Sequence, residues 1–342
     1  MPAISILDLS PVPSGSASAD ALRNSVDLAR HAEAFGYARY WVAEHHNTGA
    51  MACSAPEILI GQIAANTTRI RVGSGGVMLP NHSALHVAEC FKVLEALHPG
   101  RIDLGIGRAP GTDQVTASAL RRGLDLTFPN QMAELLAFAG GGFPTGHPFE
   151  QVTAHPAEVA LPPIWILGSS DHGAQVAAAL GVGFAFAHHL NPRGAWPAIA
   201  LYRERFLPSG QLAEPRAILT ASAIAADTAE RAEELSWSLA LGVIRLRQGR
   251  SGPLPTPEVA MAHAYTDDEA DQVRRYRRAQ TLGTGEDVRS QLVEMLEETG
   301  ADELMIMSTV HGHGERVRSY ELIAEAFALP GGAALQKANA TH

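Results

Sequence analysis

The sequence predicts an α/β fold, a closed (β/α)8 TIM barrel, and three observations point to it. The chain has 342 residues, which suits a single barrel of this type. Hydrophobic residues make up 46% of the chain and charged residues 18%, so a large core can be buried. Short strand-like runs alternate with longer helical patterns eight times, which favours a closed parallel barrel over an open doubly wound sheet. No linker or second core is visible, so we expect one domain over residues 1–330 and a disordered tail at 331–342.

The first third of the chain shows the alternation most clearly. Leu22, Val26 and Ala29 recur on one face of the first expected helix, and Gly36 is a typical helix stop. The expected strands cover residues 3–9, 39–43, 69–79 and 101–107, and the helices between them cover 19–36, 56–67 and 83–97.

The second part of the chain is less regular. Residues 140–163 are rich in Gly and Pro, which predicts a long surface excursion. Residues 249–285 break the alternation, and we expect an inserted loop there, before the last helix–strand unit. The remaining expected strands cover 163–170, 183–189, 216–226 and 303–309. The remaining expected helices cover 171–181, 194–206, 228–246, 286–300 and 315–329.

Polar residues follow most of the expected strands. In a parallel barrel the C-terminal ends of all strands meet at one face, which is where such barrels place their chemistry. The residues at these ends are Ser10, Glu44–His46, Ser74–Gly76, Gly107–Arg108, Gly168–Ser170, His188–His189 and His311–His313. We therefore expect a shared site at this face.

Two of these groups favour an anion. Arg108 follows a strand beside small residues, and Ser169 and Ser170 precede a helix whose free N–H groups and dipole suit a phosphate. Alternatively, Ser170 or Asp171 is simply the N-cap of that helix. The two interpretations are compatible, because a capping turn and an anion site use the same backbone.

A metal site is the alternative that the histidines suggest. His82 and His86 have helical spacing, but Ser83 stands where a metalloprotease motif needs Glu. Adjacent histidines such as His45 and His46 point to opposite sides if both lie in a strand. We assign no metal ligands, although a metal-dependent barrel hydrolase stays an alternative.

Six stretches together resemble one protein family. They are RYWVAEHHN, IRVGSGGVMLPNH, LHPGRIDLGIGRAPGTD, WILGSS, FAFAHH and RVRSYELIAEAF. Their order resembles that of the bacterial luciferase-like flavin-dependent monooxygenases, and more narrowly the non-luminous oxidoreductases grouped beside them. The resemblance is densest in residues 1–113 and weakest in 114–160 and 245–285. It implies a barrel that binds reduced FMN, or in some branches the deazaflavin F420, with the ring over the strand ends.

The resemblance also implies which residues bind the cofactor. Arg108 would contact the flavin phosphate, and Gly168, Ser169 and Ser170 would complete the cradle. Ser74, Gly75 and Gly76 would bind near the ring, since Gly75–Gly76 falls where the superfamily has a non-proline cis peptide. His188 would line the surroundings of the flavin.

The catalytic residues follow from the same resemblance. His45 matches the family's catalytic histidine, and an imidazole titrates near neutral pH, which suits proton transfer. Glu44 would orient it or form a hydrogen bond, and His46 suits a structural role. Gly107 stands where light-emitting luciferases have a reactive cysteine, which argues against light emission. Glu89 and Arg101 are expected to form a buried ion pair.

These expectations amount to a monooxygenase that uses FMNH2 and O2 on a small organic substrate. A separate NAD(P)H:flavin reductase would supply the reduced flavin, and the resemblance implies a homodimer. An F420-dependent hydride-transfer enzyme and a non-catalytic flavin-binding protein stay as alternatives. The net charge of −10 argues against nucleic acid as a partner. The N-terminus has no signal-peptide pattern, no stretch is apolar enough to span a membrane, and the two cysteines suit a reduced, cytoplasmic protein.

Overall fold

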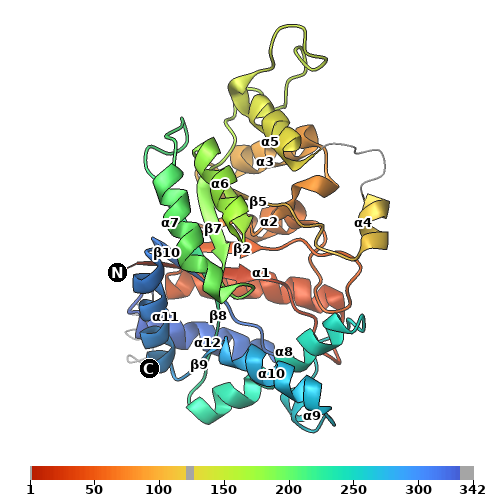
Figure 1. Ribbon diagram of the computed structural model, residues 1–342, viewed down its shortest axis with the longest axis vertical. Coiled ribbons are helices and arrows are strands. Elements are labelled where there is room, and N and C mark those ends of the chain that lie inside the picture. Colours follow the sequence, from red (N-terminus) through yellow and green to blue (C-terminus); the bar gives the residue numbers. More distant parts are fainter. Residues whose placement is uncertain (1, 121–126, 332–342) are drawn as a thin grey trace.

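The structure is a computed structural model that describes residues 2–120 and 127–331. Within this part of the chain, eight parallel strands close into a barrel, because β10 pairs with β1 on one side and with β8 on the other (Figure 1). In order around the barrel they are β1 (Ala3–Asp8), β2 (Arg39–Val42), β3 (Arg71–Ser74), β5 (Ile102–Gly107), β6 (Ile164–Gly168), β7 (Gly183–Ala187), β8 (Ala217–Ala225) and β10 (Glu303–Met307). The predicted (β/α)8 TIM barrel is confirmed. The expected tail lies, from residue 332 on, outside the described residues.

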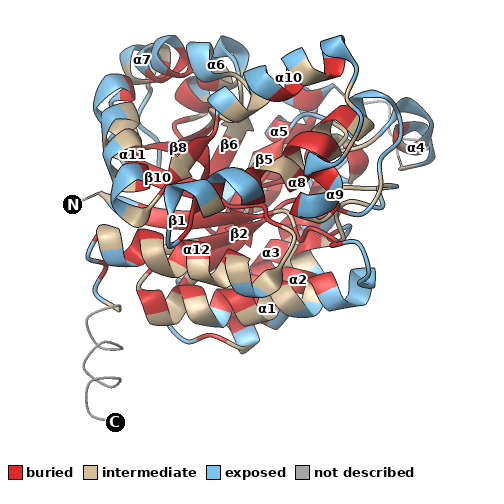
Figure 2. Cartoon of the chain, turned by 90° about the horizontal axis from the view of Figure 1, so that it is seen from below, coloured by how far each residue is buried: buried red, intermediate tan, exposed pale blue. Residues whose placement is uncertain are grey.

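Helices cover the outside of the barrel, and their outward faces are exposed while the strands are buried (Figure 2). The helices that follow the strands are α1 (Ser18–Phe35), α2 (Pro56–Ala65), α3 (Ala84–Leu97), α5 (Phe128–Leu136), α6 (Asp171–Leu180), α7 (Ala195–Arg205), α11 (Gly285–Thr299) and α12 (His313–Ala326). In α1 the buried residues recur every three or four positions, among them Leu28, Ala32 and Phe35. Gly36 ends α1 with a φ of 93°, the left-handed conformation that glycine adopts most readily.

Shorter elements extend this frame. The turn η1 (Leu79–Asn81) follows the two-residue strand β4 (Val77–Met78), and η3 (Pro192–Gly194) precedes α7. Helix α4 (Gln114–Leu120) and the π-helical turn η2 (Ala137–Gly141) belong to the excursion between β5 and β6. From residue 142 to 163 the chain forms no helix or strand, as its Gly and Pro content predicted.

The barrel interior is filled at the N-terminal ends of its strands. Arg39 lies 2.9 Å from Asp103 and 2.9 Å from Glu303, and Arg71 lies 2.6 Å from Asp103, so four strands share one ionic cluster. Next to it lies an apolar layer formed by Leu7, Trp41, Trp165, Ala185, Ile218, Met305 and Met307. Side chains therefore fill the barrel interior at this end, and we expect a ligand site at the C-terminal ends of the strands.

The expected insertion precedes the last helix–strand unit, α11–β10, but it is not an irregular loop. Helix α8 (Ala229–Arg247), which precedes it, agrees with the expected helix at 228–246. The insertion itself contains α9 (Pro257–Met261), α10 (Asp267–Arg278) and β9 (Thr281–Gly283), and β9 adds to the end of β8. Helix α10 begins with a capping box between Thr266 and Glu269. Its acidic first turn and basic last turn suit the helix dipole, so this part of the expected inserted loop is a capped helix.

The expected ion pair between Glu89 and Arg101 is wrong for the described residues. Arg101 donates instead to the main-chain oxygens of Ala64, Thr67 and Ile70, whereas Glu89 accepts a hydrogen bond from the main chain of His155. Carbonyl groups at the end of a helix lack partners within the helix. The Arg101 guanidinium lies beside these carbonyl groups and donates to several of them at once. This explains why Arg101 bonds to them and not to Glu89.

Candidate functional site

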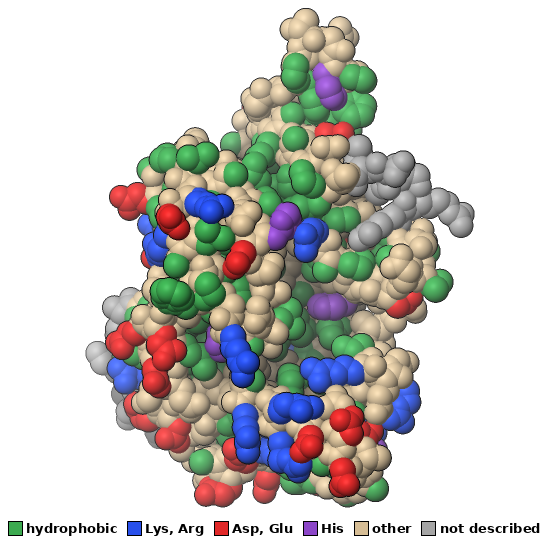
Figure 3. All heavy atoms as spheres, viewed as in Figure 1, with side chains coloured by type: hydrophobic (Ala, Val, Ile, Leu, Met, Phe, Trp, Pro, Cys, Tyr) green, Lys and Arg blue, Asp and Glu red, His purple; other side chains and the backbone are tan. Residues whose placement is uncertain are grey.

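Five consecutive strands of the barrel bring the predicted cofactor and catalytic residues to one rim. Glu44–His46 follow β2, Ser74–Gly76 follow β3, Gly107–Arg108 end β5, Gly168–Ser170 end β6, and His188 follows β7. Between α4 and the helices α8 and α10 the molecule is hollowed, and a histidine side chain lies in the hollow (Figure 3). The insertion borders the rim, because Leu254 exchanges main-chain hydrogen bonds with Val12 and Ser14, which follow β1.

Glu44 is the most highly connected residue of this rim. It is fully buried and accepts hydrogen bonds from His46 Nε2 at 2.7 Å and from His82 Nε2 at 3.0 Å. Asn81 Nδ2 donates to it at 3.0 Å and the main chain of Met78 at 2.8 Å. Glu44 therefore joins the end of β2 to the segment 78–82 that follows β3.

These contacts set the charge of the carboxylate. Burial by itself would raise the pKa of Glu44, but the hydrogen bonds from His82, Asn81 and Met78 outweigh it and lower the pKa. Burial likewise opposes the charged form of His82, whereas Glu44 raises the pKa of His82 above its ordinary value. The chemistry of this cluster is that of a carboxylate held ionised by donors, which suits positioning better than proton donation.

His45 differs from its two neighbours. Its main-chain N–H donates to the main-chain oxygen of Cys53 at 2.9 Å, and its side chain makes no hydrogen bond to Glu44. Its Nδ1 atom is buried and has no hydrogen-bond partner of good geometry among the described residues, although the main chain of Ala43 partly raises the pKa of the ring. Burial, the largest influence, lowers the pKa of His45, so the imidazole is neutral at neutral pH and can accept a proton.

A second set of hydrogen bonds fixes the loop that carries Arg108. Thr112 Oγ1 donates to the main chain of His46 at 2.9 Å, and His46 N–H donates to Gly111 at 3.2 Å. Asn47 Nδ2 donates to Asp113 at 3.1 Å. The loop after β5 is thereby tied to the loop after β2, although the two are about 65 residues apart in sequence.

Arg108 and the start of α6 lie on neighbouring strands. Ile106 of β5 pairs with Ile166 of β6. If this register continues for two more residues, Arg108 lies beside Gly168. Arg108 is exposed and makes no hydrogen bond or ion pair with another described residue. Ser170 is the N-cap of α6, yet its side chain makes no capping hydrogen bond. The first N–H groups of this ten-residue helix are thus free to bind an anion next to a guanidinium.

The segment after β3 has the cis peptide bond that the resemblance implies, between Gly75 and Gly76. Both positions lack room for a side chain. A Cβ at Gly75 would lie 2.5 Å from Leu7 Cδ1, and one at Gly76 would lie 2.7 Å from the main-chain oxygen of Gly105. Glu44 N–H donates to Gly76 at 3.3 Å, so Glu44 holds this segment through its backbone as well as its carboxylate.

The end of β7 carries two histidines in different settings. Burial lowers the pKa of His188, and burial lowers the pKa of His189 to about 4 despite its contact with the main chain of Thr220. Asn191 Nδ2 donates to the main chain of Ser169 at 2.9 Å, which positions the turn before α6. Both imidazoles are therefore neutral at neutral pH.

Three residues from other strand ends do not join this group. Ser10 bonds to Ser25 of α1, His311 contacts Ser14, and His313 contacts Asp27 of α1. His82 and His86 also diverge, since His86 lies against Cys90. Over residues 2–120 and 127–331, no three His, Cys, Asp or Glu side chains are grouped to hold a metal ion. The helices within those ranges include none that is long and apolar enough to cross a membrane.

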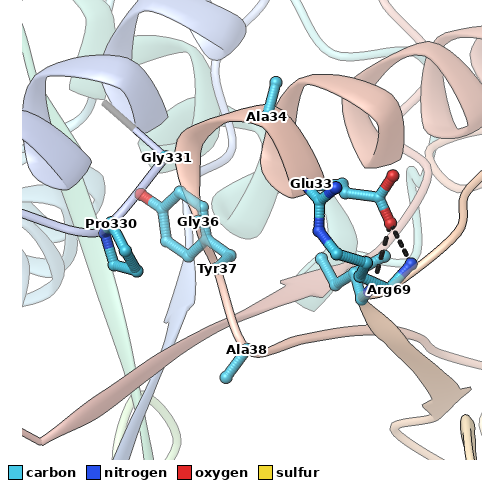
Figure 4. A pocket seen from close by; sticks show the side chains of 9 residues that line it. Glu33, Ala34, Gly36, Tyr37, Ala38, Arg69, Pro330 and Gly331 are labelled. Atoms are coloured by element: carbon cyan, nitrogen blue, oxygen red, sulfur yellow. Dashed lines mark hydrogen bonds between the residues drawn. The ribbon is translucent and has the colours of Figure 1, made fainter. Parts of the chain in front are cut away.

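Two cavities lie away from the rim. One, of about 580 Å³, is lined by Glu33, Tyr37, Arg69 and Pro330 among others, at the opposite end of the barrel (Figure 4). There the Glu33 carboxylate accepts a hydrogen bond from the main-chain N–H of Arg69, so it holds the segment before β3 in place. The other, of about 640 Å³, lies between α1 and α2 beside Cys53. Burial raises the pKa of the Cys53 thiol to about 12, so this thiol is unreactive at neutral pH.

Several residues of the site were missed from the sequence. They are Asn81 and His82 around Glu44, Asn47, Thr112 and Asp113 between the two loops, and Asn191 behind Ser169. The stretches LPNH and APGTD do follow strands, which is the signal that could have flagged them. Their partners lie on other strands, and no sequence pattern reveals those.

Comparison with known proteins agrees with this geometry. The family model described as luciferase-like monooxygenase matches residues 3–303. The chain is 45% identical to a luciferase-like monooxygenase of Escherichia coli (strain K12) over 94% of this chain and 95% of the relative. It is 36% identical to the N-acetyl-S-alkylcysteine monooxygenase of Bacillus subtilis (strain 168), over 94% of this chain and 97% of the relative.

Solved structures show the same relationship. The crystal structure of apo-MsnO8 has a TM-score of 0.87 and 37% identity, over 96% of this chain and 99% of that one. Two more distant structures share the fold, namely the FMN complex of the oxygenating constituent of 3,6-diketocamphane monooxygenase and an F420-dependent secondary alcohol dehydrogenase, at 16% and 14% identity. Flavin-dependent and F420-dependent enzymes are thus both found on this fold. The family model and the relatives together show that this chain belongs to the luciferase-like monooxygenase family of oxidoreductases.

Proposed function

We propose that this protein is a cytoplasmic monooxygenase that uses reduced FMN and O2 to oxygenate a small organic substrate. The observation that carries the proposal is the pairing of Arg108 with the uncapped start of α6 on adjacent strands. This pairing fits a phosphate group, which FMN has, at the same rim as the unpaired Nδ1 of His45. Bound reduced flavin supplies the electrons that activate O2.

The remaining chemistry belongs to side chains of this protein. Arg108, Gly168, Ser169 and Ser170 hold the phosphate through charge-assisted hydrogen bonds. Ser74, Gly75 and Gly76 form the wall beside the flavin ring, with His188 at its edge. Glu44 fixes that wall and the loop of His45 through the hydrogen bonds described above.

His45 has the catalytic role in this proposal. Its neutral imidazole takes up a proton at Nδ1 and returns it during turnover. Because Nδ1 is buried, the proton stays with the reactants and is not exchanged freely with water.

Two partners belong to the proposal. In this proposal a separate NAD(P)H:flavin reductase supplies the reduced flavin. The protein forms a homodimer through α2 and α3, where Ile58, Val93 and Leu97 are 72%, 47% and 68% exposed. N-acyl thioethers of the N-acetyl-S-alkylcysteine type are the first substrates to test, since a relative in this family is named for them.

An anaerobic fluorescence titration with oxidised FMN, reduced FMN and F420 tests the cofactor. Preferential binding of reduced FMN, followed by O2-dependent oxygenation of a substrate, supports the proposal. Tight binding of F420 alone would indicate a hydride-transfer enzyme. If neither FMN nor F420 binds, the protein has the fold but not the proposed cofactor chemistry.

A further inference from the structure

Gln280 reaches the barrel rim from the insertion. It directly precedes β9, whose Thr281 pairs with Ala223 of β8. Gln280 Nε2 donates to Ser222 Oγ at 3.4 Å. Ser222 pairs with Met307, the last residue of β10, so the contact lies at the C-terminal end of the barrel.

Ser222 points into the barrel. Side chains alternate along a strand, so Ser222 shares its face with Ile218 two pairs earlier. Ile218 belongs to the interior layer with Trp165, Met305 and Met307. Gln280 therefore extends over the open end of the barrel and not into the space between strands and helices.

Gln280 has an unused acceptor. The residue is 7% exposed and Ser222 is 4% exposed. Gln280 Oε1 is buried and accepts no hydrogen bond from any side chain or backbone group within the described ranges. A buried amide oxygen without a partner is unfavourable, so a bound molecule that donates a hydrogen bond to it gains affinity.

The position of Gln280 complements that of His45. In the closed order β10, β1, β2, β3, β5, β6, β7, β8, strand β8 lies four strands from β3 and three from β2 around the ring. Gln280 thus stands across the rim from the loop that carries His45. A small molecule bound between them has one end near the proton acceptor and the other at Gln280.

We propose that Gln280 Oε1, supported by Ser222, accepts a hydrogen bond from an amide N–H of the substrate and selects N-acylated compounds. The inference rests on the proposed function for what happens to the bound molecule. The requirement that the substrate carry a hydrogen-bond donor follows from Gln280 itself. Its Oε1 atom can only accept a hydrogen bond, and its Nε2 already donates to Ser222.

The test compares two ligands that differ in one group. N-Acetyl-S-methylcysteine has the amide N–H, and 2-acetoxy-3-(methylsulfanyl)propanoate has an ester oxygen in its place. Equilibrium binding of both is measured by calorimetry on the FMN-loaded protein, and oxygenation is measured separately with a flavin reductase present. Wild-type protein is expected to bind the amide about 10- to 100-fold more tightly, since the ester leaves Gln280 Oε1 unpaired.

Two variants isolate the contact. Gln280→Leu removes the acceptor at similar volume and is expected to lose the preference for the amide while binding FMN as wild type does. Gln272→Leu is the control, because Gln272 lies on α10 and bonds to Asp268 at the exposed surface. Thermal unfolding of each variant shows whether it folds.

The outcomes separate the two proposals. If wild type prefers the amide and Gln280→Leu does not, the inference holds even where no oxygenation follows, and only the proposed function then fails. Equal binding of amide and ester by wild type, no binding of either, or an unchanged preference in a folded Gln280→Leu protein would overturn the inference.

Discussion

His82 Nε2 lies 3.0 Å from both carboxylate oxygens of Glu44, 38 residues away in sequence. This contact joins the loop after β2 to the turn before α3, and the main chain of Glu44 also donates to Gly76 at 3.3 Å. It is the link on which the shape of the candidate site depends most.

The pH dependence of stability reports on this contact. Because the folded pKa of Glu44 is lowered, its contribution is present above 4.5 and is lost as the pH falls through the folded pKa. Because the folded pKa of His82 is raised, its contribution is present below 6.5 and is lost as the pH rises through the folded pKa. The stability difference between wild type and His82→Gln should therefore be largest between pH 4.5 and 6.5. Urea unfolding over a pH series measures it, and a difference that is flat with pH would contradict the ion pair.

Removing the carboxylate should destabilise the fold strongly. Glu44→Ala leaves several buried donors without their acceptor, so we expect a loss of about 3–5 kcal/mol in the free energy of unfolding. Glu230→Ala, at an exposed position of α8, should change it by less than about 0.5 kcal/mol. Urea unfolding of the three proteins checks this, and equal effects of the two substitutions would show that Glu44 is not a structural centre.

His45→Gln should separate binding from turnover. The amide keeps most of the side-chain volume but cannot take up a proton, so we expect FMN binding close to wild type and turnover lower by about 10²- to 10⁴-fold. Burial holds the pKa of His45 below 6.5, so wild-type turnover should fall only as the pH decreases below that value. Steady-state rates against pH give both quantities, and wild-type rates in His45→Gln would remove His45 from the mechanism.

Arg108→Ala should weaken cofactor binding specifically. A charge-assisted hydrogen bond to a phosphate contributes about 1.5–3 kcal/mol, which corresponds to roughly a 10- to 100-fold higher Kd for reduced FMN. Arg23→Ala is the matched control, since Arg23 is an exposed arginine of α1 that pairs only with Asp20. Riboflavin lacks the phosphate and should bind both variants alike. If Arg108→Ala weakens the binding of riboflavin as much as the binding of reduced FMN, Arg108 does not contact the phosphate.

The oligomeric state can be tested at α2 and α3. Val93 and Leu97 lie one turn apart on α3, and Ile58 is exposed on the neighbouring α2. Placing a charge in an apolar interface is costly, so Ile58→Asp combined with Leu97→Asp should convert a dimer into folded monomers. Light scattering after size-exclusion chromatography measures the mass. A monomeric wild type, or a variant that stays dimeric, would rule out this interface.

Much of the fold followed from local patterns. Alternating strand and helix periods predicted the barrel, and Gly36 ends α1 as its position in the sequence suggested. The rule that barrel strands present their C-terminal ends at one face predicted that Glu44, Arg108 and Ser169 lie at one rim. Helix α8 was predicted and the insertion after it was located correctly, but α9, α10 and β9 within the insertion were expected to be a loop because Pro and Gly around them dominated the pattern.

Pairings between distant residues were decided by the tertiary structure alone. The sequence could not show that His82 would bind Glu44, that Arg101 would bond to carbonyl groups near the end of α2 in place of Glu89, or that β9 would carry Gln280 to Ser222. Periodicity and turn chemistry are properties of residues close together in the chain, so they can be predicted from the sequence. Partners from different strands meet only when the barrel closes with a particular register, and packing and hydrogen bonding throughout the chain fix that register.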